Sequence, residues 1–214
     1  MKEKLIIFDM DNTVLSSRID FPLMDAETRR ILAEFGVAAD PQLATSPQMN
    51  KLEAAGRICP ACRTAVWQRV AEIEQQGMRL AEAEPGIVEL LSQLQQQAHL
   101  VLITNNCEAF ALESMRRLQL EGYFEHIWGR ESLVELKPAP GGLLQALAEY
   151  PQLTASDALM VGDGDTDFQA ARAAKMKFVA YTGSRDINWP QGSADLLLAA
   201  WDESAADRIL ELFA

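Results

Sequence analysis

Cysteine and long apolar runs are both scarce in this sequence. Only 3 of the 214 residues are cysteines, too few for a disulfide framework, so we expect a reducing, cytoplasmic setting. No apolar run approaches the roughly 20 residues that a membrane-spanning helix requires. The first residues, Met1 to Leu5, are interrupted by charges and do not have the pattern of a signal peptide. The composition therefore predicts a cytoplasmic globular protein.

Basic residues are in the minority. The chain carries 19 lysines and arginines against 31 aspartates and glutamates, a formal net charge of -12. This balance disfavours broad electrostatic binding to nucleic acid or to an anionic membrane. It does not exclude a small anionic substrate, because a bound metal ion can reverse the local field. We expect neither nucleic acid nor membrane as a partner, and the sequence leaves the oligomeric state open.

Short apolar runs alternate with amphipathic segments along much of the chain. The apolar runs have the length and composition of buried parallel strands and cover residues 4–8, 100–103, 158–161, 177–181 and 196–198. Helical periodicity falls between them, at residues 86–97, 109–120, 141–150 and 167–174. This alternation predicts an α/β fold with a doubly wound parallel sheet, in which ligands bind at the carboxyl ends of the strands.

The pattern changes between residues 17 and 83, where helical periodicity is found at 25–35, 40–55 and 64–83 with little strand signal. We therefore expect a core made of residues 1–16 and 84–214, interrupted by a smaller all-α unit at 17–83. Within that unit, the spacing of Trp67, Val70, Ile73 and Leu80 favours a helix packed in a small core over a substrate-binding surface. Cys59 and Cys62 have the spacing of half a zinc site, but no further ligand pair accompanies them, so we expect two ordinary thiols.

Carboxylates follow two of the predicted strands. Asp9 and Asp11 come directly after the first strand, and Asp163, Asp165 and Asp167 follow another. One such aspartate usually caps a helix or shapes a turn. Two clusters at strand ends would instead crowd like charges into one cleft, where an unneutralised pair about 4 Å apart costs roughly 4 kcal/mol at an effective dielectric near 20. Mg²⁺, which prefers oxygen ligands, would remove that cost.

Two further polar groups are weaker signals by themselves. Thr104 and Asn105 end the strand at 100–103, where a hydroxyl and backbone N–H groups leading into a helix can hold phosphate oxygens. Lys137 stands before Pro138, and the nearby prolines restrict the backbone around it. A helix cap and a surface lysine are the ordinary alternatives for these residues.

Together the four motifs resemble those of the haloacid dehalogenase-like superfamily: Asp-x-Asp-x-Thr after the first strand, Thr-Asn after the second, Lys-Pro later, and then Gly-Asp-x-x-x-Asp. The resemblance covers residues 4 to about 181. It implies a Rossmann-like core, with a helical cap inserted where residues 17–83 lie. Two departures are minor: Asn12 and Lys175 occupy positions often held by glycine in the family, and at Asn12 the asparagine must tolerate a left-handed backbone.

The resemblance also implies a role for each residue. Asp9 corresponds to the nucleophile, which would form an aspartyl-phosphate, and Asp11 to the general acid and base. Asp163 and Asp167 correspond to metal-binding carboxylates, completed by Asp9 and the backbone carbonyl of Asp11. The remaining matches concern the phosphate: Thr104, Asn105 and Lys137 would bind its oxygens.

Asp11 also separates branches of the superfamily, because relatives that remove halide lack a second aspartate. The resemblance therefore favours a Mg²⁺-dependent phosphatase acting on a small phosphate ester such as phosphoglycolate, a sugar phosphate or a nucleoside monophosphate. A sugar-phosphate mutase, which uses the same residues, and a phosphate-binding protein without turnover are the alternatives.

Overall fold

The computed structural model describes residues 2–37, 60–183, 185, 189 and 192–214. These residues form two compact units: Met1–Ser17 joined with Ala81–Ala214, and Arg18–Leu80. No helix in the described ranges is both long and apolar enough to cross a membrane.

The larger unit is built on a six-stranded parallel sheet with the strand order β5-β4-β1-β6-β7-β8. The predicted doubly wound sheet is confirmed. Its strands are β1 (Leu5–Phe8), β4 (His99–Ile103), β5 (His126–Trp128), β6 (Ala158–Gly162), β7 (Lys177–Tyr181) and β8 (Leu196–Leu198). Every residue of β1 and β6 is buried, which is why these segments read as continuous apolar runs rather than as alternating patterns.

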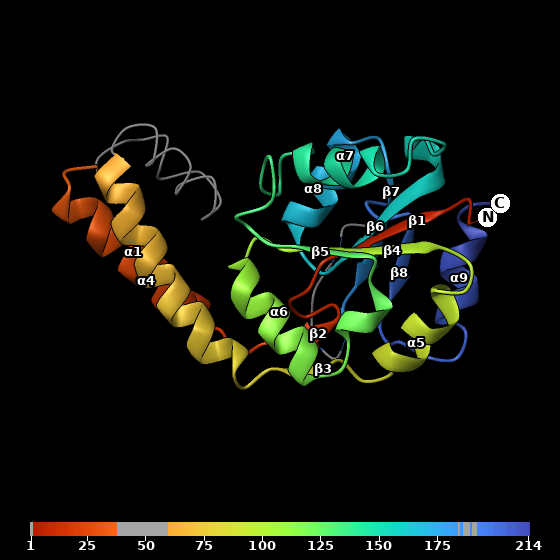
Figure 1. Cartoon of the computed structure of the whole chain (residues 1–214), viewed down its shortest axis with the longest axis horizontal. Helices are drawn as coiled ribbons and strands as arrows, with labels where there is room; N and C mark the ends of the chain where they lie inside the picture. Colours follow the sequence, from red (N-terminus) through yellow and green to blue (C-terminus); the bar gives the residue numbers. More distant parts are fainter. Residues whose placement is uncertain (1, 38–59, 184, 186–188, 190–191) are drawn as a thin grey trace. The chain divides into compact units, whose positions relative to one another are not determined.

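Helices cover both faces of the sheet, with α7 and α8 on one face and α5, α6 and α9 on the other (Figure 1). Their bounds are α5 (Ile87–Leu94), α6 (Glu108–Arg117), α7 (Gly141–Ala148), α8 (Asp165–Ala173) and α9 (Ala205–Glu211). The core next to α7 and α8 includes Leu5, Ile7, Met160 and Phe178. Because side chains alternate along a strand, the residues between these pack on the opposite face.

The order of the strands determines where a site can form. From β1 the chain crosses to β4 and β5 on one side, then returns to β6, β7 and β8 on the other side of β1. A crevice therefore opens at the carboxyl ends of β1 and β6, where successive connections leave in opposite directions. Phe8 pairs with both Leu102 and Val161, so the residues after these three strand positions lie at a common level.

Several elements were not expected from the sequence. β5 has only partly buried residues, and α9 has seven residues, so neither carries a strong periodic signal. β2 (Leu15–Ser16) and β3 (Glu82–Ala83) form a short antiparallel pair. The expectation of helix to residue 83 was therefore wrong at its end, because the helix stops at Met78 and the chain continues into β3. Two 3-10 turns complete the larger unit, η1 (Glu121–Tyr123) and η2 (Ala155–Asp157).

The smaller unit contains two described helices, α1 (Phe21–Glu34) and α4 (Pro60–Met78). Asp20 begins α1 by accepting a 2.8 Å hydrogen bond from the backbone N–H of Leu23 through its side chain. Buried residues on each helix, such as Ile31 on α1 and Val66 on α4, form the apolar side of the pair. The helix expected at 40–55 lies outside the described residues, as does Cys59.

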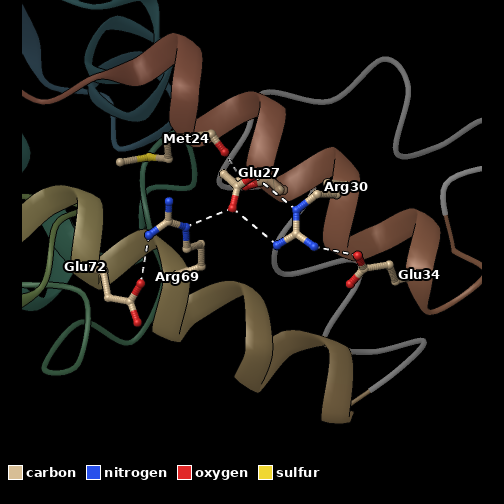
Figure 2. Close-up of polar contacts among 7 residues, drawn as sticks. Met24, Glu27, Arg30, Glu34, Arg69 and Glu72 are labelled. Carbon is tan, nitrogen blue, oxygen red and sulfur yellow. Dashed lines mark hydrogen bonds and ion pairs between the residues drawn. The ribbon is translucent and has the colours of Figure 1, made fainter.

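A network of ion pairs links α1 and α4 on their polar side (Figure 2). Glu27 of α1 accepts from Arg69 of α4 at 2.9 Å and from Arg30 of its own helix at 3.1 Å. Two further pairs extend the chain of charges, from Arg30 to Glu34 at 2.5 Å and from Arg69 to Glu72 at 2.8 Å. The hydrogen bonds from Arg30 and then Arg69 lower the pKa of Glu27, so this carboxylate is ionised at neutral pH.

The predicted apolar residues of the second helix divide into two groups. Val70 and Ile73 are buried and Trp67 is half-buried, in agreement with a role in packing. Leu80 is 65% exposed, so its expected place in the core was wrong. The physical reason is that α4 ends at Met78, and Met78 itself fills the buried position.

Candidate active site

Polar residues that are almost completely buried follow directly after two central strands. Asp9 continues β1 by donating its backbone N–H to the carbonyl of Val161 at 2.9 Å, and its side chain lies at the sheet edge with only 7% of the residue exposed. Thr104 continues β4 in the same way, with a 3.0 Å bond to Trp128, and is 1% exposed. Buried polar groups are costly unless they are paired, so their placement here requires partners.

The chain after Asp9 turns back sharply, which places Asp11 beside the same edge. The carbonyl of Met10 accepts from Val14 at 2.9 Å and from Leu15 at 3.1 Å, and Asn12 adopts a φ of 55°. This left-handed backbone at Asn12 was predicted from its place in the motif, and it is confirmed. Asparagine tolerates that conformation better than most residues because its short side chain can bond locally.

Lys137 is the centre of the site. It is 2% exposed, and its Nζ lies 2.5 Å from Asp9 Oδ1, 2.7 Å from Asp167 Oδ1 and 3.1 Å from the carbonyl of Ile103. Burial opposes its charge, but the carboxylates of Asp167 and Asp9 outweigh this and raise the pKa of Lys137 above its ordinary value. The ammonium group is therefore permanently charged and joins two of the aspartates.

Asn105 holds the backbone of Lys137 in place. Its side-chain Nδ2 donates to the carbonyl of Lys137 at 2.8 Å, and its Oδ1 accepts from the backbone N–H of Lys137 at 3.0 Å. Both polar groups of the Asn105 side-chain amide thus bind the backbone of Lys137, which lies in another loop. This explains how Lys137, far away along the chain, reaches the strand ends with a fixed orientation.

Three carboxylates gather beside Lys137. One oxygen from each of Asp9, Asp163 and Asp167 lies within 4.8 Å of the others. Burial, with added repulsion from the neighbouring carboxylates, raises the pKa of Asp9 well above its ordinary value against the attraction of Lys137. Burial and then Asp167 raise the pKa of Asp163 to about 6, while Arg185 acts in the opposite direction.

The start of α8 fixes the position of Asp167. The side chain of Asp167 accepts from the backbone N–H of Gly164 at 3.0 Å, which is the capping arrangement expected at a helix start. Gly162 lies so close that an added Cβ would be 2.5 Å from Asp167 Oδ2. Asp165, which the sequence left without a chemical role, is exposed and bonds Gln169.

Arg185 is a site residue that sequence reasoning missed. Its guanidinium forms an ion pair with Asp163, and it donates to the backbone carbonyls of Asn12 at 2.6 Å and Thr182 at 3.1 Å. It thereby connects the loop after β1 with the acidic loop after β6. No motif marks a single arginine in the loop after β7, so its position depends on the tertiary structure.

Among the residues that the structure describes, four carboxylates contribute to the site, because Asp11 also lies close enough to raise the pKa of Asp9. Lys137 contacts Asp9 and Asp167, and Arg185 contacts Asp163. Carboxylate oxygens at this spacing are the ligands that a hard ion such as Mg²⁺ prefers. The donor set therefore fits a divalent metal.

Asn106 is the second residue that sequence reasoning missed. It is 7% exposed, and its side-chain amide donates to Asp11 Oδ2 across two neighbouring loops. Its sequence position beside Thr104 and Asn105 was the only available signal. A run of two asparagines after a strand does not show which of them faces the adjacent loop.

The chain matches the family model of the haloacid dehalogenase-like hydrolases over residues 6–181. A phosphoglycolate phosphatase of Aliivibrio fischeri is 30% identical over 191 residues, which cover 84% of each chain. Among solved structures, a predicted phosphoglycolate phosphatase from Haemophilus somnus is similar with a TM-score of 0.67 at 20% identity, over 100% of both chains. A putative beta-phosphoglucomutase from Thermotoga maritima has a TM-score of 0.64 at 21% identity, over 97% of this chain and 99% of that one.

The chain therefore belongs to the haloacid dehalogenase-like hydrolase family. Within this family it is an enzyme of the phosphatase class, as the relatives that are similar over most of their length are. The resemblance seen in the four sequence motifs is confirmed.

Proposed function

We propose that this protein is a Mg²⁺-dependent phosphomonoesterase that works through an aspartyl-phosphate on Asp9. One observation carries the proposal: the buried ammonium group of Lys137 bridges Asp9 and Asp167, and Asp163 completes a carboxylate cluster beside it. A nucleophile that must approach a phosphate dianion needs both a cation and a metal site within reach. A structural ion pair alone would not account for the additional acids.

In this proposal Asp9, Asp163 and Asp167, with the backbone carbonyl of Asp11, hold the metal. Bound Mg²⁺ would neutralise charge on the transferring phosphoryl group and on Asp9. The raised pKa values of Asp9 and Asp163 support the assignment, because they reflect carboxylates that burial and mutual repulsion disfavour as anions.

The chain's own residues then divide the reaction into two displacements. An oxygen of Asp9 attacks phosphorus while the bond to the leaving oxygen breaks, and Asp11 gives its proton to that oxygen. In the second displacement water attacks phosphorus while the bond between phosphorus and Asp9 breaks, and the water passes a proton to Asp11. Lys137 and the hydroxyl of Thr104 bind the phosphoryl oxygens, and Asn105 keeps Lys137 in position.

Phosphoglycolate is the first substrate to test, because relatives similar over most of their length are named phosphoglycolate phosphatases. Its phosphate would occupy the site described above. We assign the choice among small phosphate esters to the helical unit at residues 17–83, acting as a cap on the catalytic unit.

Phosphate release measured on a panel of phosphomonoesters, with and without Mg²⁺, tests this function. We expect Mg²⁺-dependent turnover that Asp9→Asn lowers on the order of 10³-fold, which corresponds to about 4 kcal/mol of barrier. Asp165→Asn is the matched control, since Asp165 is an exposed carboxylate close to the acidic cluster. Near-normal turnover by Asp9→Asn would refute the nucleophile assignment.

The intermediate can be tested directly by acid quenching during turnover of a ³²P-labelled ester. We expect protein-bound label that hydroxylamine removes, and none in Asp9→Asn. Two other results would favour the alternatives: an isomerised product without phosphate release indicates a mutase, and an absence of turnover across the panel indicates a binding protein.

A further inference from the structure

Asn106 lies where two catalytic loops meet. It follows β4, and its side-chain Nδ2 donates a hydrogen bond to Oδ2 of Asp11, which follows the neighbouring strand β1. Asn106 is buried, with 7% of its surface exposed. A hydrogen bond from an amide to a carboxylate is among the stronger kinds, and this one is partly buried.

The backbone of Asn106 is fixed on both sides. Its N–H donates to Oγ1 of Thr104 at 3.2 Å, and its carbonyl accepts from the N–H of Arg130 at 2.8 Å. Arg130 also donates from its side chain to the carbonyl of Asn105 at 3.2 Å. These contacts hold the loop that carries Asn106 without involving Asp11. The backbone position from which the Asn106 side chain reaches Asp11 is therefore fixed.

The direction of this hydrogen bond favours one oxygen of Asp11 as the carrier of a proton. The Nδ2 group of an amide is a donor only, so the oxygen that it contacts, Oδ2, acts as an acceptor. The carbonyl-type oxygen of a protonated carboxyl group is the better acceptor, so this contact favours Oδ1 as the oxygen that holds the transferable proton. An unconstrained carboxylate could present either oxygen and rotate about its terminal bond, and much of the general acid's effect depends on orientation.

We propose that Asn106 is a positioning residue that orients Asp11 for proton transfer, an inference that rests on the proposed phosphatase function. In the first displacement the Oδ1–H bond of Asp11 breaks, and the proton passes to the leaving oxygen as its bond to phosphorus breaks. In the second displacement Oδ1 takes a proton from the attacking water as the bond between phosphorus and Asp9 breaks. In this role Asn106 acts through Asp11 in both displacements.

Leaving groups that differ in their need for a proton separate this role from a purely structural one. An alkyl phosphate such as phosphoglycolate expels a poor leaving group that must be protonated, whereas p-nitrophenyl phosphate expels a stabilised phenolate. We measure kcat/KM for both esters, because this constant reports the displacement in which the leaving group departs. Loss of the correct position of Asp11 should lower kcat/KM mainly for the alkyl ester. Damage to the phosphate-binding loop should lower kcat/KM for both esters by a similar factor.

For Asn106→Ala we expect kcat/KM to fall on the order of 10²-fold for the alkyl ester and only about 3-fold for the aryl ester, given the usual size of general acid catalysis. In an Asp11→Ala background the same substitution should cause no further selective loss. Asn105→Ala is the matched control in the same loop. This substitution removes the hydrogen bonds to the backbone of Lys137 and should lower kcat/KM by a similar factor for both esters.

Equal losses on the two esters for Asn106→Ala would overturn the inference, as would a selective loss that persists without Asp11. If Asn106→Ala does not fold, Asn106→Ser gives the same comparison, because it keeps a small polar side chain in the loop but is too short to reach Asp11. An absence of turnover of both esters by the wild type would instead overturn the proposed function, and the inference with it.

Discussion

Replacement of Lys137 by methionine tests the charge arrangement of the site without reference to turnover. The substitution keeps an unbranched side chain of similar length in a buried position and removes one positive charge. Nζ of Lys137 lies 2.5 Å from Asp9 and 2.7 Å from Asp167, so the variant leaves two buried carboxylates without their common cation. We expect a large loss of stability in the metal-free protein at neutral pH.

The magnitude follows from the geometry. At an effective dielectric near 20, each of these contacts corresponds to a gross attraction of roughly 6 kcal/mol. Desolvation of the lysine offsets much of this attraction. The net loss of stability when one partner of a buried ion pair is removed is about 3–5 kcal/mol. For a chain of this size the melting temperature should fall by roughly 6–20 °C.

The loss should depend on pH and on metal in a defined direction. Without Lys137 the pKa of Asp9 rises further, so the folded state binds more protons than the unfolded state over a wider acidic range. The variant is then less destabilised at about pH 5 than at pH 7. Mg²⁺ should restore part of the stability at pH 7, because it supplies positive charge to the same carboxylates.

Thermal unfolding in EDTA and in excess Mg²⁺, at both pH values, provides the measurement. Lys175→Met is the matched control, because Lys175 is exposed and should be replaced with little change. A melting temperature of Lys137→Met within about 2 °C of the wild type in EDTA at pH 7 would refute the reasoning. A destabilisation that is the same at pH 5 and pH 7 would show that lost packing, not charge, is responsible.

Further predictions concern pH, backbone space and the helical unit. Because the pKa of Asp163 is raised to about 6, the metal-free folded state holds more protons than the unfolded state between about pH 4 and 6. Urea unfolding should show roughly 3 kcal/mol lost from this group as the pH rises through that window, and Mg²⁺ should remove the loss. Gly162→Ala should weaken Mg²⁺ binding in calorimetry at least about 10-fold, since its Cβ would displace Asp167, which lies 2.5 Å away; unchanged affinity would contradict this placement. Glu27→Gln should lower the thermal stability of the helical unit at low salt and less at high salt, because it removes the carboxylate shared by Arg30 and Arg69. Glu72→Gln, which affects a pair within one helix, is the control and should change little.

The core of the larger unit could be predicted from the sequence because its signals are local. The buried strands are apolar runs that end abruptly, and each is followed by a polar residue of distinctive type, as at Asp9, Thr104 and Asp163. Parallel strands bring their carboxyl ends to one edge, so the order of motifs along the chain was sufficient to place these residues together. The left-handed backbone at Asn12, with a φ of 55°, was likewise implied by its position in the turn.

Weak or misleading local signals explain what was missed. β5 is short and only partly buried, and its pattern does not differ from that of a loop. Leu80 has the right spacing for the apolar side of α4, but spacing cannot show that the helix ends before it, at Met78. The helix expected at 40–55 lies outside the described residues and stays a prediction.

The sequence by itself determined the class of fold and the order of the polar motifs that we propose for phosphoryl transfer, because strand burial and motif order are properties of the chain. Only the tertiary structure decided which groups touch. It joined Lys137 to both Asp9 and Asp167, used Asn105 to hold that lysine, and brought Arg185 and Asn106 to the acidic loops. These contacts connect residues far apart along the chain, and no periodicity or spacing encodes the direction in which a side chain crosses from one loop to the next.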